Sequence, residues 1–121
     1  MIKSNILLVG AVSLLMSTSV LSQEKQYVAA DDSPETRLCV TAADGTINKF
    51  RRQVHNYGLQ GPLAIKYRFV ANKVYCNGFN ITQFAEDAGN DVVAMKLKQY
   101  RKNTVYIYDI AKVNHGNVII K

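Results

Sequence analysis

The chain has 121 residues, with 15 Lys and Arg against 9 Asp and Glu, so its formal net charge is +6. This length suits one domain, and a composition of 48% hydrophobic and 20% charged residues excludes a disordered chain. Two prolines and seven glycines exclude a collagen-like or proline-rich polymer. Two cysteines are too few for a disulfide-framework miniprotein or an all-cysteine zinc site.

Residues 1–22 have the pattern of a secretory signal peptide. A positive start at Lys3 precedes an apolar run over 6–16, and small residues lead to a cleavage site after Ser22. The run is too short to cross ~30 Å of hydrocarbon as a helix, which argues against the alternative of an uncleaved anchor. No later segment approaches the ~20 apolar residues of a span. We therefore expect a periplasmic or secreted protein with no transmembrane span after cleavage.

Export bears on the two cysteines, because the compartment outside the cytoplasm is oxidising. An even cysteine count in a small exported domain favours a disulfide, which we expect between Cys39 and Cys76. Closing a loop of about 38 residues stabilises a fold by ~4 kcal/mol in the chain-entropy model. The alternative is two separate buried thiols. A redox-active pair is disfavoured because the chain has no Cys-x-x-Cys motif.

The exported chain begins with residues 23–32, which are polar and lack any period, so we expect a flexible acidic lead. Residues 33–121 are expected to form a single small domain. Ser33 is a helix cap, Pro34 suits the first helical position, and Gly45 is a helix stop, so the first helix is predicted between them.

A second helix is predicted after Thr46, which can cap it. Arg51, Arg52 and His55 lie off its apolar stripe. The stripe has helical spacing and consists of Ile47, Phe50, Val54 and Tyr57.

The period changes at residue 65. Residues 65–70 alternate and are rich in strand formers, 71–73 suit a turn, and 74–76 return to strand formers. This pattern predicts a β-hairpin ended by Asn77 and Gly78.

The helical pattern then returns. Asn80 and Gln83 form a capping box for a short helix that stops at Gly89, and Asp91 begins another helix. In that last helix we expect Val92, Val93, Leu97 and Tyr100 to face inward, and Lys96, Lys98, Arg101 and Lys102 to face outward.

The C-terminal segment is β-rich. Residues 104–113 favour strand, 114–117 suit a turn, and 118–120 suit a last strand. The expected fold is therefore α+β: two short helical hairpins with an intervening β-hairpin and a β-rich C-terminal segment.

The two helical hairpins echo one another at an offset of 43 residues. Residues 38–45 resemble the first helix and turn of an ankyrin repeat, and 78–100 resemble a second copy. Neither copy has the Thr-Pro-Leu-His signature, and two copies are fewer than a solenoid needs. A pair of ordinary helical hairpins is the alternative.

The region from Glu35 to about Tyr100 also resembles a small family of exported bacterial proteins known only as a domain of unknown function. The residues that carry the resemblance are Leu38-Cys39, Cys76-Asn77-Gly78 and Phe84-Ala85. It implies an envelope location and carries no activity, cofactor or site residue.

No convincing catalytic or metal set stands out, so we expect no enzyme activity, cofactor or metal. His55 and His115 lack a ligand spacing, and Ser33 is better explained as a helix cap than as a nucleophile. A dyad of one cysteine with a histidine requires the disulfide to be absent. The main enzymatic alternative is a small secreted nuclease that uses His55 and His115 as acid and base.

Charge placement is the clearest functional signal. Acidic residues dominate up to Asp44, and basic residues dominate the rest of the chain. Such a surface attracts anions at long range, although a basic face that only aids solubility is the alternative. No motif that reads DNA or RNA is present. The predicted anion-binding residues are Arg51, Arg52, Lys96, Lys98, Arg101 and Lys102.

We therefore expect an exported, non-enzymatic binding or interaction module of the bacterial envelope that contacts an anionic component or protein through a basic face. A structural envelope protein whose partner is a second copy of itself is a further alternative.

Overall fold

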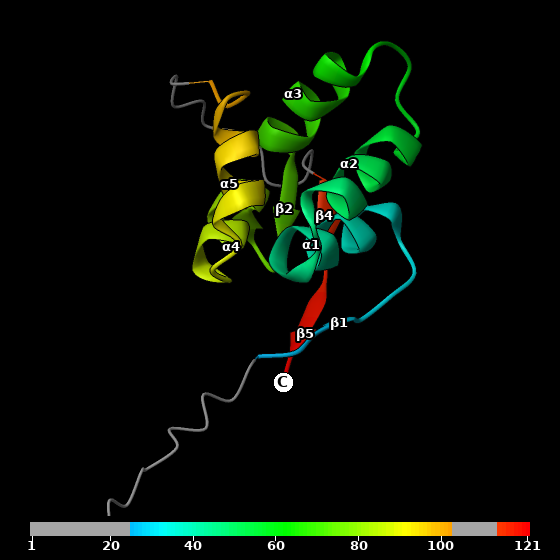
Figure 1. The fold of residues 1–121 in the computed structure, drawn as a ribbon. Helices are drawn as coiled ribbons and strands as arrows, with labels where there is room; N and C mark the ends of the chain where they lie inside the picture. Colours follow the sequence, from blue (N-terminus) through cyan, green and yellow to red (C-terminus); the bar gives the residue numbers. More distant parts are fainter. Residues whose placement is uncertain (1–24, 103–113) are drawn as a thin grey trace, which may run out of the picture.

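The computed structural model describes residues 25–102 and 114–121. The predicted signal peptide and the segment 104–113 lie outside these residues. In Figure 1, α4 and α5 lie on one side, α1 and α2 on the other, and α3 crosses above them; strands β2 and β4 lie between the helices, and β1 and β5 lie below. The elements are β1 (Tyr27–Ala29), α1 (Pro34–Asp44), α2 (Ile47–Asn56), α3 (Leu63–Lys73), β2 (Val74–Cys76), β3 (Phe79–Asn80), α4 (Ile81–Asp87), α5 (Asp91–Lys98), β4 (Asn114–Gly116) and β5 (Val118–Ile120).

The expected α+β class is confirmed, and the predicted caps begin three of the helices. The Ser33 hydroxyl accepts a hydrogen bond from the Thr36 N–H at 3.2 Å and starts α1. Thr46 does the same for α2 by accepting from the Lys49 N–H at 3.2 Å. The Asn80 side chain starts α4. These bonds satisfy backbone N–H groups that have no partner within a helix.

The predicted strand over residues 65–70 is wrong, because these residues belong to helix α3. Tyr67, Val70 and Ala71 are all buried, and their spacing of three and four residues puts them on one helical face. Packing of this face against the core outweighs the strand preference of the aromatic and β-branched residues. A hairpin does form, but between β2 and β3.

Two small sheets complete the fold. One has the order β3-β2-β4, with β2 and β4 parallel, so residues 114–116, predicted as a turn, form a strand instead. The other pairs β1 with β5, and the predicted strand over 118–120 is confirmed. Residues 27–29 lie in the segment for which we expected a flexible lead, and they form β1. Their partner strand lies at the opposite end of the chain.

The predicted disulfide is present. Cys39 in α1 and Cys76 in β2 are bonded, with Cα atoms 5.7 Å apart, and both are fully buried. Strand β4 passes directly beside this bond at Gly116. A Cβ atom at this position would lie 2.7 Å from the Glu35 carbonyl oxygen, so only glycine permits this close approach.

The 43-residue echo is visible in the packing. Helix α1 packs against α2 and α4, and α4 packs against α5. The Asn90 side chain donates to the carbonyls of Ala42 at 3.0 Å and Gly45 at 2.9 Å, so the second hairpin's turn holds the end of α1. Four equivalent pairs are buried in both copies: Leu38 and Ile81, Ala42 and Ala85, Phe50 and Val93, Val54 and Leu97.

In α5, Val93 and Leu97 are buried as expected, whereas Val92 is 61% exposed, so its predicted inward position is wrong. Val92 and Val93 are adjacent, and adjacent residues on a helix do not share a face. Within residues 25–102 and 114–121, no helix is long and apolar enough to cross a membrane.

Candidate functional site: a basic cavity over two stacked tyrosines

The structure divides the predicted basic face between two cavities. Arg51 and Lys96 line one cavity, and Lys98 and Arg101 line another. The division follows from helix geometry, since residues two positions apart on a helix do not face the same way. Four of the six predicted residues therefore separate into two pairs. Arg52 and Lys102 are exposed and line neither cavity.

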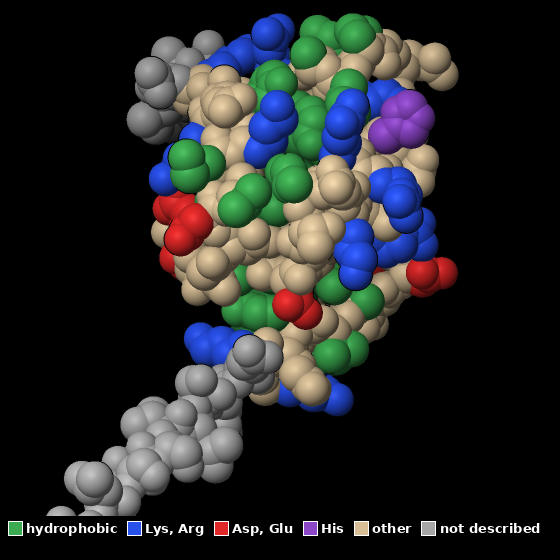
Figure 2. Space-filling model, in the orientation of Figure 1, with side chains coloured by type: hydrophobic (Ala, Val, Ile, Leu, Met, Phe, Trp, Pro, Cys, Tyr) green, Lys and Arg blue, Asp and Glu red, His purple; other side chains and the backbone are tan. Residues whose placement is uncertain are grey.

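The first cavity, which we call the tyrosine cavity, has a volume of about 350 Å³ and lies where α2, α3 and α5 meet. Helix α2 contributes Ile47, Asn48 and Arg51, and α5 contributes Lys96. Leu63, Ala64 and Tyr67 of α3, together with Tyr100, complete the lining. On the face drawn in Figure 2, basic side chains lie on either side of hydrophobic ones in this region. The cavity thus combines an apolar wall with two cations.

Two tyrosine rings stack in this lining. The ring centroids of Tyr67 and Tyr100 are 5.2 Å apart, with an angle of 14° between the planes. The Lys96 ammonium lies 5.4 Å from the Tyr67 centroid and 5.6 Å from the Tyr100 centroid, which is cation–π distance for both rings. Phe50 packs against Tyr67 with centroids 6.1 Å apart. These contacts hold the Lys96 charge beside the cavity.

Asn72 ties the segment that follows α5 to α3. Its amide nitrogen donates to the Tyr100 carbonyl at 2.8 Å, and its amide oxygen accepts from the Lys102 N–H at 3.0 Å. Since Tyr67 and Asn72 lie on the same helix, these bonds fix the distance between the two tyrosines. Asn72 is therefore a positioning residue for the cavity.

Within the part of the chain that the structure describes, the Tyr67 hydroxyl has no hydrogen-bond partner, although the residue is only 2% exposed. Buried hydroxyl groups are normally bonded, so such a group is unusual in a folded protein. Burial raises the pKa of Tyr67, and the positive charge of Arg51 opposes that shift. Tyr67 thus lines the cavity and carries a protonated, buried hydroxyl on which the charge of Arg51 acts.

The cations of the tyrosine cavity are not neutralised by the described part of the chain. Neither Arg51 nor Lys96 is paired with a carboxylate there, and no acidic residue lines the cavity. In the second cavity, of about 400 Å³, Lys98 forms an ion pair with Glu86. Arg101 donates from Nη1 to the Ala71 carbonyl at 3.2 Å. The two cavities therefore differ in how far their charges are already compensated.

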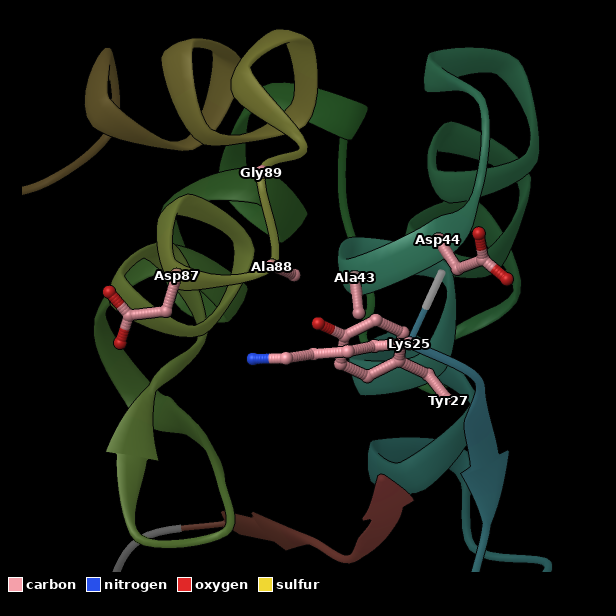
Figure 3. Close-up of a pocket in the computed structure, with 7 residues that line it drawn as sticks. All are labelled: Lys25, Tyr27, Ala43, Asp44, Asp87, Ala88 and Gly89. Carbon is pink, nitrogen blue, oxygen red and sulfur yellow. The ribbon is translucent and has the colours of Figure 1, made fainter. Parts of the chain in front are cut away.

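A third cavity, of about 410 Å³, lies between the ends of α1 and α4 (Figure 3). Lys25, Asp44 and Asp87 contribute its charged groups. The two carboxylates point apart in Figure 3, so they do not form an acid/base pair. Among the described residues, no group of three His, Cys, Asp or Glu side chains is arranged to hold a metal.

The two histidines lie on separate elements. His55 is exposed near the end of α2, and His115 is exposed in β4, where its ring lies 6.3 Å from that of Tyr75. Neither residue lines any of the three cavities described above.

Residues 38–112 match the family described as "Protein of unknown function (DUF3718)". The chain belongs to the DUF3718 family. This confirms the family resemblance found in the sequence. No curated protein and no solved structure matches the chain significantly. The matched segment of this DUF3718 member contains every residue that lines the tyrosine cavity and both cysteines, whereas β1 and β5 lie outside it.

Sequence reasoning found Arg51 and Lys96 but missed Tyr67. The miss follows from the error over residues 65–70, since a strand would have placed Tyr67 in a hairpin away from α5. The signal was present in the sequence: Leu63, Tyr67 and Ala71 recur every four residues after Pro62, which is helical spacing after a helix-start residue.

Proposed function

We propose that the protein is an exported, non-enzymatic binding module that contacts an anionic component of the bacterial envelope through Arg51 and Lys96. The supporting observation is that these two cations line one cavity without a carboxylate partner in the described part of the chain. Uncompensated charges in a concave, partly apolar surface concentrate anions from a distance.

A binding role also fits the state of the cysteines. Both sulfur atoms are joined in a buried disulfide, so neither is available as a thiolate nucleophile. The disulfide ties α1 to β2, and so links the first helical hairpin to the strand that precedes β3 and α4.

The test is binding of the exported protein to phosphatidylglycerol vesicles and to lipopolysaccharide, with neutral phosphatidylcholine vesicles as the reference. Binding at low salt should weaken steeply at high salt, because exposed charges are screened over about 8 Å at physiological ionic strength. Arg51→Glu with Lys96→Glu should abolish it. Arg52→Glu is the matched control, since Arg52 is exposed on the same helix and lines no described cavity.

Absence of binding to both anionic probes at low salt contradicts the proposal. An equal loss in the Arg52→Glu control contradicts the assignment to the cavity. If the protein instead hydrolyses DNA or RNA, and His55→Asn or His115→Asn removes that activity, the nuclease alternative is correct.

Export has its own test. The mass of the protein recovered from the periplasm or the medium should correspond to a chain that starts at or near Gln23. Intact Met1 in a membrane fraction would refute export by signal cleavage.

A further inference from the structure

We propose that the tyrosine cavity is a binding site for a small amphipathic oxyanion, meaning a single carboxylate or phosphate head joined to a compact apolar body. This inference rests on the proposed function, because it assigns anion recognition to the same two cations and names the kind of ligand that they select.

Three donors from three helices favour an anionic head group. Arg51 from α2 and Lys96 from α5 supply two charged donors, and Tyr67 from α3 supplies a hydroxyl donor. The Tyr67 hydroxyl has no partner in the described structure and is buried. An oxyanion that accepts from this hydroxyl supplies the missing bond, and charge-assisted bonds of this kind are the strong ones. A ligand without an anionic head leaves both the hydroxyl and the charges unsatisfied.

The rest of the cavity lining favours an apolar body. Ile47, Leu63 and Ala64 supply aliphatic surface, and the tyrosine rings supply aromatic surface. Inorganic phosphate alone would leave this surface uncovered. Burial of apolar ligand atoms against it adds affinity that salt does not screen.

The volume of the tyrosine cavity limits the size of the ligand. About 350 Å³ lies at the lower end of the range of small-molecule pockets, ~300–1,000 Å³. A single ring with its head group suits such a space, and an extended polymer does not. A polyanion can still be attracted to the surface as a whole, but it would not make the bond to Tyr67.

The second basic cavity serves as an internal control. There Lys98 already has Glu86 as a partner, and Arg101 is bonded to a backbone carbonyl. An anion entering that cavity competes with an existing ion pair. We therefore assign the ligand to the tyrosine cavity alone.

The experiment uses phenyl phosphate as the probe. Inorganic phosphate represents the anionic head without the apolar body, and benzyl alcohol represents the apolar body without the anionic head. Titration of the exported protein, followed by backbone amide chemical shifts, should show phenyl phosphate binding more tightly than either half. The perturbed amides should map to α2, α3 and α5. Tyr67→Phe and Lys96→Gln should each weaken binding about tenfold, the effect of losing one charge-assisted hydrogen bond. Tyr75→Phe and Lys98→Gln should leave it unchanged.

No binding of phenyl phosphate, equal binding of inorganic phosphate, or full affinity in a folded Tyr67→Phe variant overturns the inference. Amide chemical shifts of the variant establish that it is folded. The proposed function fails separately: if neither vesicles nor lipopolysaccharide bind while phenyl phosphate does, the envelope role falls and the ligand site stands. If vesicles bind and phenyl phosphate does not, the ligand site is wrong and the envelope role stands.

Discussion

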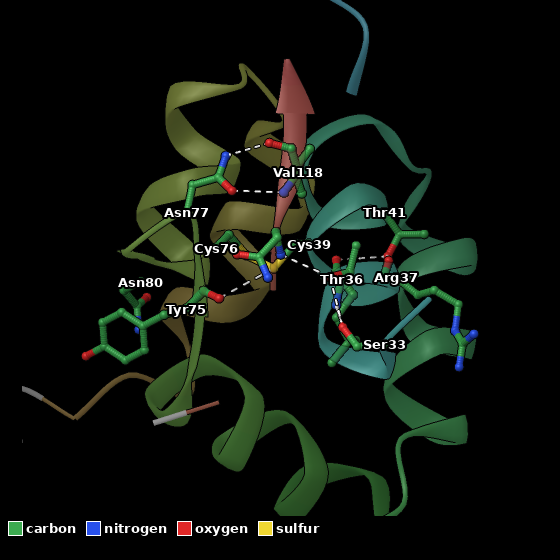
Figure 4. Close-up of a disulfide and its surroundings, with 12 residues drawn as sticks. Ser33, Thr36, Arg37, Cys39, Thr41, Tyr75, Cys76, Asn77, Asn80 and Val118 are labelled. Atoms are coloured by element: carbon green, nitrogen blue, oxygen red, sulfur yellow. Dashed lines mark hydrogen bonds between the residues drawn. A yellow bond between two sulfur atoms is a disulfide. The ribbon is translucent and has the colours of Figure 1, made fainter. Parts of the chain in front are cut away.

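The side-chain amide of Asn77 makes both of its hydrogen bonds to the backbone of Val118 (Figure 4). Its nitrogen donates to the Val118 carbonyl at 2.9 Å, and its oxygen accepts from the Val118 N–H at 2.8 Å. Asn77 has a φ of 50°, a left-handed conformation that asparagine tolerates better than most residues. One side chain thus pairs with the backbone of β5 in the way a neighbouring strand would, and joins the turn after β2 to the sheet of β1 and β5.

Replacing Asn77 by Gly should lower the free energy of unfolding by about 1–2 kcal/mol, because two hydrogen bonds of ordinary strength are lost. Glycine is the informative substitution, since it adopts a positive φ without strain in the folded protein. Urea denaturation followed by circular dichroism measures the change. The control is Asn56→Ala, because Asn56 is exposed and lies in helix α2, where alanine is well tolerated. This variant should leave the stability nearly unchanged. An unaltered midpoint for Asn77→Gly would contradict the role.

Loss of the disulfide should cost about 4 kcal/mol of stability, as the chain-entropy model gives for a loop of this length. The double variant Cys39→Ala and Cys76→Ala should show this loss in denaturant titrations. A reductant should destabilise the original protein and leave the double variant unaffected. In the unreduced protein, alkylation should find no free thiol even in denaturant, because both sulfur atoms are bonded. Modification of either cysteine without reductant would show that the bond does not form in the cell.

Acid sensitivity should depend on Asp31. Hydrogen bonds from Ser33, and then from Thr36 and Asn117, hold the pKa of Asp31 well below its ordinary value in the folded protein. Since the pKa is lower in the folded state, Asp31 stabilises the fold above pH ~4, and this contribution disappears as the pH falls below that value.

The variant Asp31→Asn should therefore have a lower melting temperature at pH 7. Below pH ~4 its melting temperature should fall less with decreasing pH than that of the unmodified protein. Asp32→Asn is the matched control, because Asp32 is the next residue and its carboxylate forms an exposed ion pair with Arg37. Thermal unfolding from about pH 2 to pH 7 measures both effects. The same pH dependence in Asp31→Asn and in the unmodified protein would rule out the assignment.

The sequence predicts those parts of the fold that depend on neighbouring residues. Ser33, Thr46 and Asn80 begin helices as predicted because capping involves only the next two or three residues. Strand β1 was missed because its partner, β5, is at the other end of the chain, and a polar segment of three residues has no recognisable period of its own.

The candidate site was predicted in part for the same reason. Arg51 and Lys96 were recognised as off the apolar stripes of their helices, which is a local property. That they line one cavity depends on the packing of α2 against α5, and the role of Tyr67 depends on α3, where the alternating sequence favoured a strand. Lys96 and Lys98 were grouped together, although their spacing on a helix places them on different sides.

Two tyrosines with opposite environments give a final test of the site. The Tyr57 hydroxyl donates to Glu35 Oε1 at 2.8 Å, whereas the Tyr67 hydroxyl has no partner among the described residues. Tyr57→Phe should lower the free energy of unfolding by about 1–2 kcal/mol, because a hydrogen bond to a carboxylate is lost.

Tyr67→Phe should leave the stability unchanged or raise it by up to about 1 kcal/mol, since a buried hydroxyl without a partner is removed and no bond is broken. Denaturant titration of the two variants side by side measures this difference. Removal of the same atom should therefore destabilise the protein at Tyr57 but not at Tyr67. If Tyr67→Phe destabilises the protein as much as Tyr57→Phe does, the Tyr67 hydroxyl has a partner within the fold and is not available to an incoming oxyanion.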